Sequence, residues 1–484
     1  MTLRCDLIIR DATILDGTGA PRQRGDVAVT GDRIAGVGAL GAWTAGTEVM
    51  AEGKALAPGF IDAHTHDDRA VLCGPACMLC KMSQGVTTVV VGNCGISLSP
   101  TPMAARPVPP LDLLGDESWF TFGSFAAYAE RLARDPAPVN TVALIGHMSL
   151  RLAAMHGDTQ RAATAAEAAV MQTRLAESLA AGASGFSTGL AYPPNLPAPT
   201  DEVIAVAEAL RAAGGLYVTH MRDEAEGVLD SIAETLHIGR AAGVPVVISH
   251  HKCAQPENFG RSVETLPAIE AGAAGQQVAF DVYPYAAGST VLIPDRVRED
   301  VPTRITWSIP HPEAEGRWLA DIARDWGVSW RAAAERLLPA GGIFFQMDEA
   351  DVRRILAHPL SMIGSDGLPH DAFPHPRLWG TFPRVLGHYV RDARLFSLET
   401  AVHKMTGRTA AVFGLVGRGV IRPGAYADLV LFDPATVQDA ADFDQPTRPA
   451  PGILQTWVNG QRSYVWGEGA TPARAGRLLT RGRG

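Results

Sequence analysis

The middle of the chain alternates short apolar runs with amphipathic stretches. Eight runs, most of them rich in valine, isoleucine or phenylalanine, are Ala57–His64, Gly85–Cys94, Asn140–His147, Gly182–Gly189, Gly215–His220, Val244–His250, Gln277–Pro284 and Leu360–Gly367. Helical stretches such as Thr164–Ala181 separate them. Strands that alternate with helices indicate parallel βαβ units. Eight units predict a (β/α)8 TIM barrel within an α/β fold, and a doubly wound open sheet is the alternative.

Both ends of the chain predict a second, smaller unit of strands. Residues 1–56 combine alternating apolar positions with Gly and Asp-Gly turns, and Asn459–Gly460 near the other end is a hairpin signal. We therefore expect a small β-sandwich domain built from residues 1–56 and 416–484, on either side of a barrel at 57–415.

Two segments are too long to be simple crossover connections. Residues 97–114 contain five prolines and predict an irregular loop. The region 285–347 separates the last two runs by more than a crossover helix needs. Loops of this length in a compact domain are usually functional, so we expect an inserted lid there.

Side chains that can bind metal follow most of the apolar runs. In a (β/α)8 barrel the C-terminal strand ends form the active site. These ends carry His64, His66, Cys94, His147, Ser187, Thr188, His220, His250, His251, Asp281, Tyr283 and Asp366. Alternate strand residues point the same way, so both histidines of the first pair can face one ion. A lone buried cysteine is usually inert packing, but beside converging imidazoles Cys94 fits a zinc site better.

Three cysteines form a second motif. Cys73, Cys77 and Cys80 have the C-x3-C-x2-C spacing of a radical-SAM iron–sulfur site. The segment around them is expected to be an amphipathic helix between the first two strands. Leu79 also stands where that motif usually has an aromatic residue. We interpret these cysteines as helix packing, and a radical-SAM enzyme stays an alternative.

Composition narrows the class of protein. Lys+Arg is 42 and Asp+Glu is 51, giving a net charge of −9, and no basic cluster is present for nucleic acid. No apolar run is long enough to cross a membrane, and the N-terminus resembles a strand rather than a signal peptide. Six cysteines are too few for a disulfide scaffold. We expect a cytoplasmic protein that acts on a small molecule, with an oligomeric state that the sequence does not reveal.

Several motifs together resemble one family. HTHDD, GNCGIS, ISHHK and GSDGLPH occur in this order, and similar motifs extend over essentially the full chain. They resemble the D-aminoacylases, the N-acyl-D-amino-acid deacylases of the amidohydrolase superfamily. This resemblance implies zinc-dependent hydrolysis of an N-acyl-D-amino acid to a free D-amino acid and a carboxylate.

The resemblance also implies roles for particular residues. It places a tight zinc site at Cys94, His220 and His250, and a second, weaker or empty site at His64, His66 and Asp366. Asp366 would take a proton from water and deliver it to the leaving amine. Many superfamily members hold two metals through a carboxylated lysine. Here Lys54, Lys81 and Lys404 are expected at a sheet edge or in helices, so none of them serves that purpose.

Substrate binding requires a cation for the α-carboxylate. The resemblance favours Lys252 and Arg377 for this role, with Tyr283 as a further donor. Tyr192 and Arg296 are additional candidates. Arg296 would favour an acidic side chain such as D-glutamate, whereas an apolar pocket would favour D-leucine, D-methionine or D-phenylalanine.

Other functions remain open at this point. A cyclic-amide hydrolase resembling dihydropyrimidinase is the nearest alternative, although it needs the bridging lysine. A non-catalytic amidohydrolase-like scaffold would act through protein partners, and such relatives typically lose metal ligands. All six implied ligand positions are filled here.

Overall fold

The computed structural model describes residues 3–483, and its centre is a closed barrel of parallel strands. The strands are β6 (Phe60–Asp62), β7 (Val86–Val91), β8 (Asn140–Gly146), β9 (Gly185–Gly189), β10 (Leu216–His220), β11 (Val246–Ile248), β12 (Val278–Val282) and β16 (Ser361–Ile363). The ring closes between β16 and β6, where the Ala63 amide donates to the Ile363 carbonyl at 3.1 Å and Thr65 bridges with Gly367. All eight runs are strands, which confirms the predicted barrel and excludes the open sheet.

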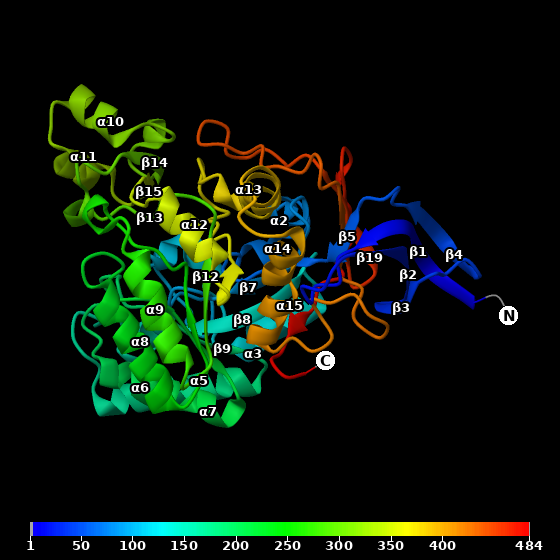
Figure 1. Cartoon of the computed structure of the whole chain (residues 1–484). Coiled ribbons are helices and arrows are strands. Elements are labelled where there is room, and N and C mark those ends of the chain that lie inside the picture. The colour runs from blue at the N-terminus through cyan, green and yellow to red at the C-terminus, as the bar shows by residue number, and fades with distance from the viewer. Residues whose placement is uncertain (1–2, 484) are drawn as a thin grey trace.

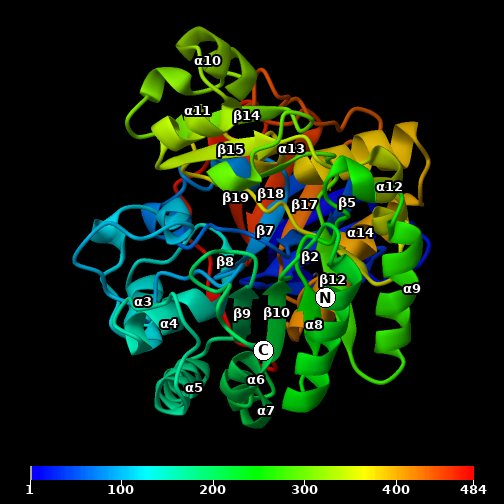
Figure 2. The same ribbon diagram turned by 90° about the vertical axis from the view of Figure 1, so that its left-hand side faces the viewer.

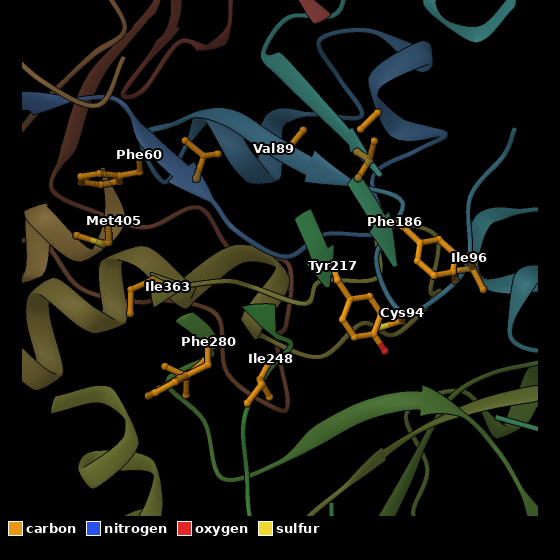
Figure 3. Packing of buried hydrophobic residues seen from close by; sticks show 14 of the residues in the cluster. Phe60, Val89, Cys94, Ile96, Phe186, Tyr217, Ile248, Phe280, Ile363 and Met405 are labelled. Atoms are coloured by element: carbon orange, nitrogen blue, oxygen red, sulfur yellow. The ribbon is translucent and has the colours of Figure 1, made fainter. Parts of the chain in front are cut away.

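The barrel is packed on both sides of its wall. Alternate residues of each strand face opposite ways: Val90 joins an inner apolar cluster with Leu144 and Val218, and Val89 joins the outer one. Figure 3 shows part of the outer cluster, which includes Cys94. The interior is therefore a filled core, and chemistry is confined to the barrel ends.

Helices cover the barrel (Figure 1). They include α3 (Phe125–Arg134), α4 (His147–Ala154), α5 (Ala165–Ala180), α6 (Thr200–Ala207), α7 (Ala209–Ala213), α8 (Val228–Ala242), α9 (Ser262–Ala273), α12 (Glu349–Ala357), α13 (Arg377–Arg384), α14 (Leu398–Met405) and α15 (Gly407–Phe413). Thr164 begins α5 with a reciprocal capping box to Glu167. No helix in residues 3–483 is long and apolar enough to span a membrane.

Both chain ends build one β-rich domain, drawn on the right of Figure 1. Its strands are β1 (Leu3–Ile14), β2 (Gln23–Thr30), β3 (Arg33–Gly38), β4 (Trp43–Met50), β5 (Ala55–Pro58), β17 (Leu429–Phe432), β18 (Ile453–Val458), β19 (Gln461–Val465) and β20 (Gly469–Ala470). Leu7 and Ile9 from one end share an apolar cluster with Leu431 and Trp457 from the other. A small β-rich domain with strands from both termini is therefore present, as expected. Its strands belong to one sheet rather than to two separate sheets of a sandwich. The last residues depart from it, because β21 (Leu478–Leu479) pairs with β8 of the barrel.

The region between β12 and β16 contains an inserted subdomain. Strands β13 (Gly288–Val291), β14 (Thr303–Ser308) and β15 (Ala340–Phe344) form an antiparallel sheet, and α10 (Leu319–Trp326) and α11 (Trp330–Leu337) lie beside it. This subdomain has its own apolar cluster. It stands at the top of the molecule in Figure 2.

The cysteine-rich segment is not the single helix that we expected. It forms two short turns, α1 (Ala70–Cys73) and α2 (Leu79–Met82). Gly74 with φ of 99° and the following Pro75 end the first turn. Cys77 is exposed, so the expectation of buried packing is wrong for this residue. Among the described residues these cysteines join no potential metal group.

Candidate active site

Three of the implied site residues have a left-handed backbone. Cys94 (φ 54°), His250 (φ 35°) and Asp366 (φ 50°) each lie two or three residues after a barrel strand. This region is uncommon for residues other than glycine, and such strain gathers at functional sites. The three side chains come together at the C-terminal mouth of the barrel, where their ligand atoms lie near one another.

One group of donors contains Cys94, His220 and His250, with their ligand atoms all within 4.8 Å of one another. The Cys94 sulfur lies 3.4 Å from His250 Nε2. Burial opposes ionisation of the Cys94 thiol, but His64 and His250 outweigh it and hold its pKa well below its ordinary value. A thiolate with two imidazoles is a zinc donor set that leaves a coordination position open.

A second group contains His64, His66, Cys94 and Asp366. His64 Nε2 lies 3.2 Å from the Cys94 sulfur, and His66 Nε2 lies 3.2 Å from Asp366 Oδ1. The structure therefore brings together all six implied ligands. It also places Cys94 in both groups, whereas the resemblance implied it only for the first.

Comparison with known proteins identifies the family. The Amidohydrolase family model matches residues 47–324 and 317–464. A D-aminoacylase from Alcaligenes xylosoxydans xylosoxydans is 54% identical over 477 residues, which is 98% of each chain. The chain belongs to the D-aminoacylase family of amidohydrolases. This assignment excludes the radical-SAM reading.

Solved structures of D-aminoacylase family members share the fold. A D-aminoacylase, studied for a binuclear metal centre with one-metal activation and second-metal attenuation, has 53% identity and a TM-score of 0.96, covering 99% of this chain and 100% of its own. An N-acyl-D-glutamate deacylase from Bordetella bronchiseptica, complexed with zinc and a phosphonate inhibitor, has 49% identity and a TM-score of 0.94, covering 98% and 99%. The chain therefore belongs to the metal-binding hydrolases.

Two carboxylates that sequence reasoning did not select orient the histidines of this D-aminoacylase-family site. Asp281 Oδ1 accepts the His250 backbone N–H at 2.8 Å, and its other oxygen lies 3.4 Å from His64 Nδ1. Glu224 Oε1 lies 2.9 Å from His250 Nδ1. Such partners fix which ring nitrogen stays free for metal. Asp281 stood at a predicted strand end, whereas Glu224 lies in the loop after β10 and gave no such signal.

Asp366 is paired with a buried cation. Arg377 Nη1 lies 2.9 Å from Asp366 Oδ2. Burial alone raises the pKa of Asp366, but Arg377 and His64 outweigh it and keep that pKa well below its ordinary value. The carboxylate is therefore ionised, which is the form that a proton acceptor needs.

The candidate carboxylate-binding residues gather around one aromatic ring. Lys252 Nζ lies 5.8 Å and the Arg377 guanidinium 4.6 Å from the centre of the Tyr283 ring. Lys252 also lies 2.7 Å from Glu224 Oε1, and Arg377 donates to the Ser289 carbonyl at 3.0 Å. Two cations thus share one short stretch of the mouth, next to the metal groups.

A cavity of about 390 Å³ opens beside His220. Its lining includes Arg296, Val291 and Phe344 from the insertion and Glu224 from the barrel. Tyr192 lies nearby, because its ring centre is 4.9 Å from that of His220 and its hydroxyl lies 2.8 Å from Thr290 Oγ1. The volume suits a small ligand.

Other polar strand ends serve the fold. His147 Nε2 lies 3.2 Å from Glu202, and His251 Nε2 lies 2.9 Å from Thr265 Oγ1. The Ser187 hydroxyl donates to the Gly92 carbonyl. None of these belongs to a potential metal group in residues 3–483.

Proposed function

We propose that the protein is an N-acyl-D-amino-acid deacylase that hydrolyses the amide bond to a free D-amino acid and a carboxylate. One tightly held zinc would be bound by Cys94, His220 and His250, with a second, weaker site at His64, His66 and Asp366. The observation that supports this most strongly is the junction of two metal-donor groups at Cys94, beside a pair of cations.

Zinc held by these residues would supply one part of the chemistry, namely polarisation of the amide carbonyl and a pKa of about 7 for a bound water. Asp366 supplies the other part. Its Oδ1 faces His66, and its Oδ2 is held by Arg377. As an ionised carboxylate it takes a proton from the attacking water and then delivers this proton to the leaving nitrogen, which departs only as an amine.

Positioning of the substrate falls to the residues around Tyr283. Lys252 and Arg377, the two cations that lie against the Tyr283 ring, bind the α-carboxylate. The Tyr283 hydroxyl adds a donor, and Tyr192 forms a wall next to His220. Fixing the α-carboxylate and the amide carbonyl while the cavity beside His220 accepts the side chain gives the three contacts that select one enantiomer.

The insertion decides which side chain is accepted. We propose that residues 285–347 act as a lid, because they supply Val291, Phe344 and Arg296 to the cavity wall. Arg296 forms no ion pair with another described residue, whereas the other cavity arginine, Arg222, pairs with Glu234 at 2.8 Å. An unpaired guanidinium favours an acidic side chain. N-acyl-D-glutamate and N-acyl-D-aspartate are therefore the proposed substrates.

An enantiomer screen tests the activity. N-acetyl-D- and N-acetyl-L-amino acids are assayed in pairs for release of free amine. We expect turnover of the D series only, with N-acetyl-D-glutamate and N-acetyl-D-aspartate ahead of N-acetyl-D-leucine. Equal turnover of both enantiomers, or of neither, contradicts the deacylase proposal.

Elemental analysis tests the metal. We expect about one zinc per chain after exhaustive dialysis, because three Cys and His ligands make a tight site. Cys94→Ser should lose that zinc, and Cys253→Ser, which changes a buried cysteine outside both donor groups, should keep it. A wild-type protein that retains no metal contradicts the proposed mechanism.

A further inference from the structure

Lys81 is fully buried beneath the mouth of the barrel. Its ammonium group lies 2.9 Å from Asp62 Oδ2, 3.4 Å from Asp67 Oδ2 and 2.8 Å from Ser365 Oγ. Asp62 and Asp67 lie on either side of the His64–His66 pair, and Ser365 precedes Asp366. One side chain on α2 therefore contacts both segments that carry His64, His66 and Asp366, the members of the second donor group that the first group does not share.

These contacts lie at the seam where the barrel closes. Besides the backbone contacts between β6 and β16, the Asp366 amide donates to the His64 carbonyl at 2.8 Å. The Ser365 amide donates to Asp62 Oδ1 at 2.7 Å. Lys81 binds the other oxygen of Asp62 and the hydroxyl of Ser365. It thus completes a ring of interactions that fixes one loop against the other.

The Lys81 ammonium group is hard to replace because it balances the charges of two buried carboxylates. Asp62 and Asp67 are both fully buried, and Lys81 is the cation that pairs with each. The Asp67 oxygens have no hydrogen-bond partner of good geometry among the described residues. Removing one member of a buried charge group leaves the others uncompensated. Two neighbouring carboxylates without a cation would repel each other and displace the His64–His66 loop.

We propose that Lys81 is a positioning residue that holds the His64–His66 loop and the Asp366 loop in register across the barrel seam. The inference rests on the proposed roles of these loops in metal binding and proton transfer. Cys94, His220 and His250 lie at the ends of β7, β10 and β11 or just after them, and Lys81 forms no ion pair or hydrogen bond with any of the three among the described residues. Loss of Lys81 should therefore affect the second donor group and spare the first.

The experiment compares Lys81→Met with Lys404→Met. Lys404 is a matched control, because it is also buried and bonds to Ser361 Oγ at 2.7 Å, but at the opposite end of β16. For Lys81→Met we expect kcat to fall about tenfold to a hundredfold, with KM changed less than about twofold. Calorimetric zinc titration of metal-free protein should show the first equivalent unchanged and the second at least about tenfold weaker. Lys404→Met should resemble the wild type in all of these.

Several outcomes overturn the proposal. The proposal requires that Lys81→Met has a lower kcat and a lower second-zinc affinity than Lys404→Met, and that it keeps the first zinc. Equal values in the two variants, or loss of the first zinc, contradict the positioning role. If Lys81→Met does not fold, Ser365→Ala decides, since it leaves the Lys81–Asp62 pair and the backbone bonds of the seam intact. It removes the bond from Lys81 to the Asp366 loop, together with the bond from the Gly367 amide within that loop. It should lower kcat and second-zinc affinity in the same direction, and wild-type values would refute the proposal. A wild-type protein without zinc or activity would instead refute the proposed function.

Discussion

Arg377 and Asp366 form a buried ion pair, with Nη1 2.9 Å from Oδ2, at the point where the proposed proton carrier meets the proposed substrate-binding residue. Arg377 has no exposed surface, so its charge is balanced from within the site. In the proposed binding mode the substrate α-carboxylate approaches the same guanidinium. This binding mode would link substrate binding and the positioning of Asp366 through one side chain.

Arg377→Met tests this link. We expect KM for N-acyl-D-amino acids to rise by about a hundredfold, because loss of one partner of a buried charge pair costs about 2–5 kcal/mol. Zinc content should stay at the wild-type level, since Arg377 binds no donor of the first group. Steady-state kinetics and elemental analysis measure both. An unchanged KM removes Arg377 from substrate binding.

Asp366→Asn tests the proton transfer. The amide keeps the size of the carboxylate but cannot accept the proton of the water, so kcat should fall by a factor of about 10²–10⁴. The first zinc should remain, because Cys94, His220 and His250 are untouched. Asp428→Asn removes another buried carboxylate, in the small domain beside Arg418, and should leave kcat unchanged. Near-wild-type activity of Asp366→Asn would mean that another group carries the proton.

The strand ends were the part of the candidate site that could be predicted from the sequence. His64, Cys94, His220 and Asp366 end or directly follow apolar runs, and barrel geometry alone brings such ends together. Glu224 and Lys81 gave no comparable signal. Glu224 reaches His250 from a loop, where no periodicity fixes the direction of a side chain. Lys81 was expected to be an ordinary helix lysine.

Local chain geometry explains the difference for Lys81. Gly74 with positive φ breaks the segment into two short turns, and the second of these buries Lys81 completely. In a helix of four residues, hydrophobic spacing cannot show which face points inward. The barrel, by contrast, was predicted because its pattern repeats eight times. The directions of side chains in loops and very short helices could therefore not be predicted from the sequence.

Asp281→Asn tests the orientation of His64. Asparagine can keep the bond to the His250 amide through its oxygen, but its N–H2 group would then face His64 Nδ1. The imidazole proton would have to move to Nε2, the atom that faces Cys94. We expect the second zinc to bind about 10–100 times more weakly. Calorimetric titration measures this, and unchanged affinity would show that Asp281 does not set the ring proton.

The burial of Lys404 predicts that the free energy of unfolding depends on pH. Burial lowers its pKa to about 7, well below the usual value for lysine. Between pH 7 and the ordinary lysine range the unfolded chain binds more protons than the folded one, so the free energy of unfolding rises with pH there, by at most about 1.4 kcal/mol per pH unit. Lys404→Met removes this contribution. Urea unfolding at several pH values should show the variant gaining most over the wild type at pH 7 and below. A difference that does not vary with pH contradicts the assignment.

The position of Arg296 predicts which substrate side chain the enzyme prefers. Its guanidinium lines the cavity beside His220 and donates to the Ala191 carbonyl, without a carboxylate partner among the described residues. Arg296→Leu should therefore lower kcat/KM for N-acetyl-D-glutamate by about tenfold to a hundredfold, the value of a charged hydrogen bond, and should change N-acetyl-D-leucine much less.

The control for this change is Arg298→Leu. Arg298 belongs to the same insertion but pairs with Glu257 and Asp300. It does not line the cavity itself and reaches the lining only through a bond to Gln255. It should leave the ratio of the two activities at the wild-type value, which separates loss of a specific contact from a general disturbance of the lid. If Arg296→Leu lowers both activities equally, the lid supports catalysis without reading the side chain. The preference would then arise from the apolar residues of the cavity, such as Ile293 and Phe344.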